Sequence, residues 1–179
     1  MKYYISDLHL GHANVIKHDG RPFADVEEMD RSLIKMWNDT VGDDDDIYIV
    51  GDFCYRSGKT AEWYLSRLKG RKHLIVGNHD WQILKNEKAM AMFESVDKIL
   101  EIEDNGRHIV LCHYPMAEWP RSRHGGWLIY GHIHTRKDKT WEFMRTLDHA
   151  LNAAAALNYY VPVQFDCLVE NNIRYNRGI

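Results

Sequence analysis

Short apolar runs along this 179-residue chain each stop at a cluster of polar residues. The run Leu74-Ile75-Val76 ends at Gly77 and opens into Asn78-His79-Asp80. β-Branched residues suit a strand that is buried on both faces, and a glycine at its end lets the backbone turn sharply or approach a ligand closely. The pattern therefore predicts a central strand that delivers a polar cluster at its carboxyl end.

Four further apolar runs end in the same way. They cover residues 2–5, 47–50, 109–112 and 127–130, and they lead into Asp7 and His9, into Asp52, into His113, and into His132 and His134. Ligands of open α/β sheets gather beyond the carboxyl ends of the strands, so we expect these side chains to meet on one rim. A single histidine after a strand is usually a surface or core residue, but five such endings together favour a shared site.

Helical periodicity and turn signals complete the expected fold. The residues through Asn14 and His18 are expected to form a loop. A helix begins after Asp25, which can cap it, and a second helix from about Thr60 to Leu68 returns the chain to the central strand. A further short helix is expected near residues 82–93. A strand, a helix and a strand in succession favour parallel pairing, whereas Asn105-Gly106 between two apolar runs predicts a hairpin. We therefore expect an α/β fold: a layered sandwich of mixed β-sheets flanked by helices, with residues 1–179 as a single domain.

Composition narrows the classes of protein. Apolar residues make up 45% of the chain and the formal net charge is −3, so no overall basic field attracts nucleic acid or an anionic membrane. The three cysteines are an odd number and widely spaced, which argues against a disulfide framework. No apolar run approaches the length of a membrane span and no signal segment precedes the first strand, so we expect a soluble cytoplasmic protein. The oligomeric state stays open.

The strand ends carry residues that can bind metal ions. Asp7 and His9 alternate along what the pattern predicts to be extended backbone, so their side chains should point to the same side. Asp52 is the best candidate to bridge two ions because a carboxylate has two oxygens. His12 is interpreted as an exposed loop histidine.

A loop further along the chain offers a candidate for binding an anion. It contains Arg121, Arg123 and His124 between proline and glycine residues, and the planar fork of arginine matches phosphate oxygens. A solvated basic loop explains the same residues equally well, and both interpretations stay open here.

The motifs Asp-x-His, Gly-Asp, Gly-Asn-His-Asp, a lone His after a strand, and Gly-His-x-His occur in this order between Asp7 and His134. In this respect the chain resembles the calcineurin-like metallophosphoesterase family. The resemblance implies a metallo-dependent phosphatase-like fold and two bound metal ions. The ligands that it implies are Asp7, His9, Asp52 and His134 for one ion, and Asp52, Asn78, His113 and His132 for the other.

The resemblance also implies a reaction. Carboxylate, imidazole and amide ligands suit manganese, iron, nickel or zinc. Two such ions can lower the pKa of water and so activate it as a metal-held hydroxide that attacks phosphorus. His79 matches the family's histidine that stabilises or protonates the departing oxygen, and Asp80 is expected to orient its ring. The chain is therefore expected to be a hydrolase of phosphoric ester bonds.

The substrate is less narrowly implied. Nuclease members of the family have a further histidine three residues after the bridging aspartate, where this chain has Tyr55. We therefore expect a small phosphorylated substrate, with monoester and diester both open and nucleic acid disfavoured. A nuclease is the runner-up. A non-catalytic scaffold with the same fold is the other alternative, and it ranks behind because the ligand set and His79 are complete.

Overall fold

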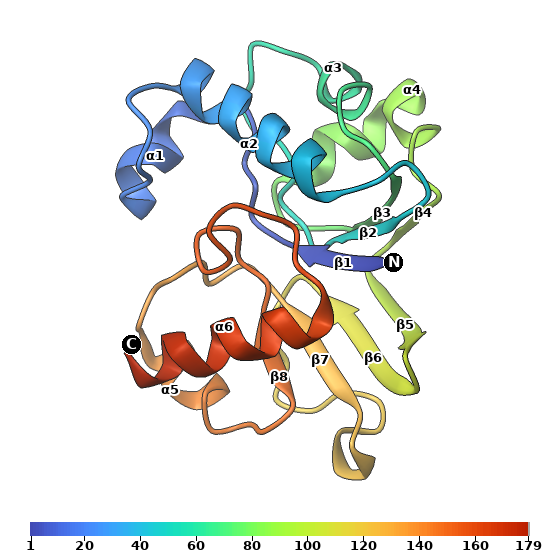
Figure 1. Cartoon of the computed structure of the whole chain (residues 1–179), viewed down its shortest axis with the longest axis vertical. Coiled ribbons are helices and arrows are strands. Elements are labelled where there is room, and N and C mark those ends of the chain that lie inside the picture. The colour runs from blue at the N-terminus through green and yellow to red at the C-terminus, as the bar shows by residue number, and fades with distance from the viewer. Residues whose placement is uncertain (179) are drawn as a thin grey trace.

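Two four-stranded sheets form the centre of the computed structural model, which describes residues 1–178 (Figure 1). The first sheet has the order β1 (Lys2–Ile5), β2 (Asp46–Ile49), β3 (Arg71–Ile75), β4 (Ser95–Asp97), and all its neighbours are parallel. The second has the order β5 (Ile99–Asp104), β6 (Arg107–Cys112), β7 (Trp127–Tyr130), β8 (Ala150–Asn152). Only β5 and β6 are antiparallel in it, so the expected layered α/β fold with a mixed sheet is confirmed.

Helices flank these sheets (Figure 1). They are α1 (Ala13–Asp19), α2 (Val26–Thr40), α3 (Ala61–Leu65), α4 (Glu87–Met90), α5 (Lys139–Met144) and α6 (Phe165–Arg177), with 3-10 turns η1 (Asp80–Lys85) and η2 (Ser122–His124). The carboxylate of Asp25 caps α2 by accepting a hydrogen bond from the backbone N–H of Glu28, as the sequence predicts. No helix within residues 1–178 is both long enough and apolar enough to cross a bilayer.

Alternating side chains of the first sheet build two cores. Tyr3 and Ile5 of β1 pack with Trp37 of α2 on one face. Tyr4, between them, packs on the other face with Leu111 of β6, in the core that joins the two sheets. The sheets are therefore the inner layers of a sandwich, and both faces of β1 are dry.

Two local features differ from the expected pattern, and a third agrees with it. Residues 13–19 form the helix α1 where the sequence suggested a loop, since this short helix has no side-chain cap and no acidic residue in its first turn. The expected helix near residues 82–93 is divided into η1 and α4, because Asn86 ends the first and caps the second. The hairpin turn at Asn105-Gly106 forms as predicted, with φ of 49° and 78°.

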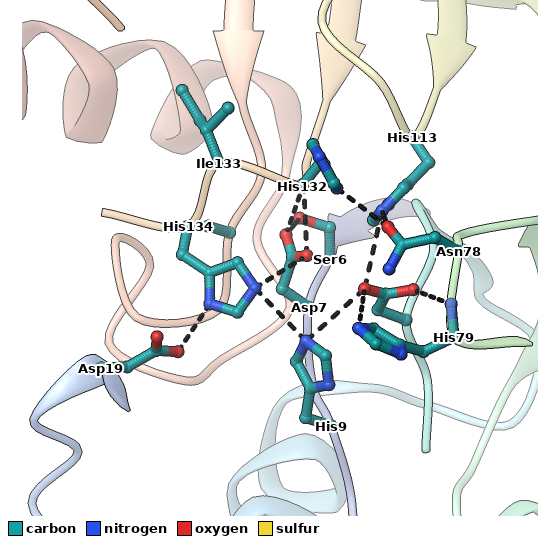
Figure 2. A network of polar contacts seen from close by, with 12 residues as sticks. Ser6, Asp7, His9, Asp19, Asn78, His79, His113, His132, Ile133 and His134 are labelled. Atoms are coloured by element: carbon teal, nitrogen blue, oxygen red, sulfur yellow. Dashed lines mark hydrogen bonds and ion pairs between the residues drawn. The ribbon is translucent and has the colours of Figure 1, made fainter. Parts of the chain in front are cut away.

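The direction of the strands determines where function can lie. β1, β2 and β3 run parallel and end at one edge of their sheet, while β6 and β7 run parallel in the second sheet. Figure 2 shows that the loops after these strands meet, with Asp7, Asn78, His113 and His134 facing one another.

Candidate metal centre

The backbone turns sharply at most of the proposed ligands. Five of them adopt the left-handed conformation with positive φ: Asp7 (55°), His9 (51°), Asp52 (56°), His132 (69°) and His134 (50°). Such residues cost on the order of 1–3 kcal/mol each and gather at functional sites. The expectation of extended backbone from Asp7 to His9 is therefore wrong. The two side chains still meet, because the backbone N–H groups of Asp7 and His9 donate to the carbonyls of Gly51 and Asp52.

Glycines next to the ligands allow the loops to approach closely. A Cβ on Gly77 would lie 2.3 Å from Oδ1 of Asp52, and one on Gly51, whose φ is 87°, would lie 2.2 Å from Nδ1 of His113. Any side chain at either position would displace a proposed ligand. These two glycines therefore belong to the construction of the site.

One group of ligand atoms gathers around Asp7. Atoms of Asp7, His9 and His134 that could bind a metal ion lie within 4.8 Å of one another. Nε2 of His134 is 3.4 Å from Oδ1 of Asp7, and Nε2 of His9 is 3.6 Å from Oδ2 of Asp52. The structure thus brings together all four residues expected to hold the first ion.

A second group adjoins the first. Oδ1 of Asn78 lies 3.1 Å from Nε2 of His113 and 2.9 Å from Nδ1 of His132. Nε2 of His113 is also 3.6 Å from Oδ2 of Asp52, so this oxygen is equally distant from His9 and His113. Asp7 likewise groups with Asp52 and His113 within 4.8 Å. Both carboxylates therefore lie between the two groups.

Hydrogen bonds outside the cluster fix two imidazole tautomers. Nδ1 of His113 donates to the carbonyl of Val50 at 2.9 Å. Nδ1 of His134 donates to Oδ2 of Asp19 at 2.6 Å, as Figure 2 shows. The Nε2 lone pair of each ring therefore points into the cluster. Such outer partners orient metal-binding histidines.

Burial and charge in the cluster fit bound cations. Asp7 and Asp52 are each 1% exposed, and burial raises the pKa of Asp52. Burial, together with neighbouring His134 and Arg21, lowers the pKa of His9, so its ring is held neutral, the form that binds metals. Nδ1 of His9 is buried without a hydrogen-bond partner among residues 1–178. Two buried carboxylates, an amide oxygen and imidazole nitrogens suit divalent ions that would compensate the buried charge.

Asp80 has partners other than the expected one. Its carboxylate is fully buried and accepts hydrogen bonds from the backbone N–H groups of Asp52, Phe53 and Gly77, at 2.9, 2.9 and 2.8 Å. Burial raises the pKa of this carboxyl to about 6. With its oxygens engaged by three N–H groups, Asp80 ties together the loops after β2 and β3, and we propose that it positions Asp52 instead of the ring of His79.

The ring of His79 is oriented by packing. Its centroid lies 4.0 Å from that of Tyr55 and 5.3 Å from that of His9, and its Nε2 is 4.0 Å from Oδ2 of Asp52. The backbone N–H of His79 donates to Oδ1 of Asp52 at 2.8 Å, and its side chain is 31% exposed. Tyr55 thus packs against the ring of His79. From the sequence, Tyr55 was noted only as the position at which nuclease members have a histidine.

The structure does not bring Arg121, Arg123 and His124 to the cluster. They surround a separate hollow with Glu118 and Trp119, and Arg123 forms an ion pair with Glu118 at 2.6 Å. Because β6 and β7 are parallel, the connection between them must return to the amino end of β7. The loop therefore lies at the edge of the sheet opposite to His132 and His134, away from the cluster, and its binding of an anion stays a prediction.

A cavity of about 410 Å³ is lined by five of the proposed ligands: His9, Asp52, Asn78, His132 and His134. Besides those ligands and His79, it is lined by His12, Val15, His18, Asp19 and Arg136. His12 is half-buried against Tyr55, with ring centroids 5.0 Å apart, and is not the exposed loop residue that the sequence suggested. Four of these residues come from α1 or the residue before it, so the unforeseen helix forms one wall.

A family model for calcineurin-like phosphoesterases matches residues 3–153, which include every proposed ligand. The chain belongs to the calcineurin-like phosphoesterase family. It is therefore a hydrolase of phosphoric esters, and the grouped Asp and His side chains are candidate metal ligands.

Relatives of this phosphoesterase support the assignment of the fold. It is 35% identical to an uncharacterized protein of Methanocaldococcus jannaschii, over 94% of this chain and 89% of that protein. The Gene 66 protein of Mycobacterium phage L5 is also 35% identical, over 74% of this chain and 77% of that protein. A solved protein of unknown function from Aquifex aeolicus superimposes with a TM-score of 0.70 and 27% identity, over 91% of this chain and 94% of the other.

A nuclease from Pseudomonas putida has the same fold at a TM-score of 0.50 and 20% identity, over 74% of this chain and 60% of that one. The likeness concerns the fold alone. The expectation that nucleic acid is disfavoured as a substrate finds no support in these comparisons.

Asp19 offers a first test of the metal centre. Burial alone would raise the pKa of Asp19, but the hydrogen bond from His134 and the nearby Arg21 lower it overall, so the carboxylate is charged and holds the His134 ring. We expect Asp19→Asn to weaken Mn²⁺ binding about 10- to 100-fold, as is usual for such outer partners. Calorimetric titration of metal-stripped protein measures this. Asp166→Asn, which removes an exposed carboxylate paired with Arg107, is the control, and equal affinities in both variants would contradict the role of Asp19.

Proposed function

We propose that this phosphoesterase hydrolyses a phosphomonoester or phosphodiester bond of a small substrate with the help of two divalent ions. The observation that supports this most directly is the position of Oδ2 of Asp52, 3.6 Å from Nε2 of His9 in one group and 3.6 Å from Nε2 of His113 in the other. A carboxylate in this position can share its oxygens between two ions. Manganese, iron, nickel and zinc all suit the donor set.

The roles of the residues follow from their places around the cavity. Two ions, when bound, lower the pKa of water and neutralise charge on the phosphoryl oxygens. Asp7, Asp52, Asn78 and the four imidazoles would hold them. His79 is partly exposed at the same cavity, so its ring can contact the substrate. We assign it the stabilisation or protonation of the departing oxygen, which converts a poor leaving group into an alcohol.

Metal removal and restoration test this proposal. The protein stripped with a chelator should not hydrolyse 4-nitrophenyl phosphate or bis(4-nitrophenyl) phosphate. Activity should return with Mn²⁺ and level off near two equivalents per chain. The ratio of the two rates measures the preference for monoesters or diesters. Full activity in the stripped protein, or none with any of the four metals, would overturn the proposal, and an empty protein that binds no metal would favour the scaffold alternative.

Nucleic acid belongs in the same assay. Single-stranded and nicked oligonucleotides, compared with the aryl esters at equal concentration, distinguish a nuclease from an enzyme for small substrates. We expect the aryl ester to be hydrolysed whichever the natural substrate is, because its reactive phosphoryl group needs only the metal pair and an accessible cavity.

A further inference from the structure

The cavity is larger than the reaction alone requires. At about 410 Å³ it falls in the range of clefts that enclose a whole small molecule, whereas a reacting phosphoryl group would occupy only the part beside Asp52 and Asn78. The remaining wall consists of His12, Val15, His18, Asp19 and Arg136. The chemistry of this wall therefore bears on the part of the substrate that is not cleaved.

Arg136 supplies the permanent charge of that wall. Its Nε donates to the carbonyl of Ile133 at 3.3 Å, which anchors the guanidinium beside the His132–His134 segment. Within residues 1–178 no carboxylate lies within 4.0 Å of it, and neither terminal nitrogen makes a hydrogen bond. The two terminal N–H₂ groups are therefore available, and they form the planar fork that binds phosphate through two hydrogen bonds.

The one acid in this wall does not neutralise Arg136. The carboxylate of Asp19 is already engaged by His134 at 2.6 Å and by Arg21 at 3.2 Å. His12 and His18 add groups that can donate hydrogen bonds, and Val15 is the only apolar lining residue of the wall. A wall of this kind favours an anionic group over an apolar one.

We propose that Arg136, with His12 and His18, binds a second phosphate group of the substrate, separate from the one that is cleaved. This rests on the proposed function and narrows its substrate to compounds that carry a second phosphate group. Water adds to the phosphorus held beside Asp52 and the ester P–O bond breaks, while the second phosphate stays on the alcohol product. The source of such a group is either a free bisphosphorylated metabolite or a neighbouring phosphate of a nucleic acid strand.

Paired inhibitors test the proposal without knowledge of the natural substrate. Hydrolysis of 4-nitrophenyl phosphate by the Mn²⁺-loaded protein is inhibited with adenosine 5′-monophosphate and with adenosine 3′,5′-bisphosphate. We expect the bisphosphate to bind at least about tenfold more tightly, since one charge-assisted pair of hydrogen bonds is worth that factor. In Arg136→Ala this advantage should disappear, with less than a twofold change for the monophosphate.

The neighbouring cation provides the matched control. Lys137 lies over the rings of Trp141 and Tyr175 and does not line the cavity, so Lys137→Ala should keep the preference for the bisphosphate. Arg136→Lys keeps the positive charge without the planar guanidinium and should retain part of the preference for the bisphosphate. Equal inhibition by the two nucleotides in the wild type, or an equal loss for both in Arg136→Ala, overturns the proposal. The proposed function survives either result as long as the aryl ester is hydrolysed.

A 5′-phosphorylated trinucleotide separates the two sources. If it inhibits more tightly than the bisphosphate and loses that advantage in Arg136→Ala, the second phosphate belongs to a strand. If it binds no more tightly than the bisphosphate, the site serves a small molecule. Both results require the loss in Arg136→Ala, which is the outcome on which the proposal depends.

Discussion

Replacing Asp52 with asparagine is expected to abolish stoichiometric binding of two ions and to reduce phosphoesterase activity by more than about 100-fold. Mutation of a residue that only supports a metal ligand already lowers metal affinity or activity about 10- to 100-fold. Asparagine keeps the size of the side chain and an oxygen for the N–H of His79, but it removes the charge and one of the two oxygens. The oxygen that is replaced is Oδ2, which lies between His9 and His113. Elemental analysis after dialysis gives the metal content, and 4-nitrophenyl phosphate gives the rate.

The same strand provides the control. Asp46 begins β2, whereas Asp52 follows its carboxyl end, and Asp46 is paired with Arg71 at 2.8 Å on the opposite edge of the sheet. Asp46→Asn removes one carboxylate from the chain without touching the cluster, and should leave both metal content and rate unchanged. Two ions retained in Asp52→Asn with normal turnover would show that Asp7 alone bridges the groups, because Asp7 also lies within reach of both.

The seven proposed ligands could be singled out from the sequence because each lies within a few residues of the end of an apolar run, and the resemblance to the family then assigned them as ligands. His134 comes from the second sheet, so its approach depends on how the two sheets pack. Where parallel strands of one sheet end together, residues far apart in the chain are neighbours, so Asp7, Asp52 and Asn78 could be placed on one rim from the strand pattern. Local spacing was sufficient for this. It was insufficient for the backbone itself, which is left-handed at Asp7 and His9 and not extended.

The partners of the ligands could not be found in this way. Asp19 contacts His134 across 115 positions of the chain, and Tyr55 contacts the ring of His79 only because two loops fold against each other. Neither residue follows a strand or belongs to one of the motifs. α1, which carries Asp19, has no capping side chain from which the helix could have been predicted.

The distance of the loop that contains Arg121 from the cluster has a topological cause. The loop follows His113 and precedes His132, and both of those lie at the cluster, so a loop between them could be expected to lie there too. Parallel pairing of β6 with β7 makes the opposite true, because the chain must cross the length of the sheet before β7 begins. Arg136, which follows the strand end instead of preceding the strand, is the basic residue that reaches the cavity.

Replacing His79 with alanine is expected to lower kcat by about 10²- to 10⁴-fold for esters of poorly acidic alcohols, the usual contribution of a positioned acid or base. Bis(4-nitrophenyl) phosphate should be affected much less, because 4-nitrophenolate departs without a proton. Metal content should stay at the wild-type level, since the backbone N–H of residue 79 still donates to Oδ1 of Asp52. The measurement is a series of aryl phosphates of rising leaving-group pKa, and the logarithm of kcat should fall more steeply with pKa in the variant.

Tyr55 allows the role of the ring's orientation to be separated from the role of the ring. Tyr55→Leu removes the aromatic surface 4.0 Å from His79 and should reproduce part of the steeper dependence on leaving-group pKa, whereas Tyr55→Phe keeps that surface and should behave like the wild type.

A uniform loss of kcat across the series in His79→Ala would instead assign this histidine to binding the phosphoryl group. Loss of metal in the same variant would make it a part of the ion-binding cluster. Only the steeper slope with two ions retained identifies His79 as the group that assists the departing oxygen, because protonation matters in proportion to how poorly that oxygen leaves.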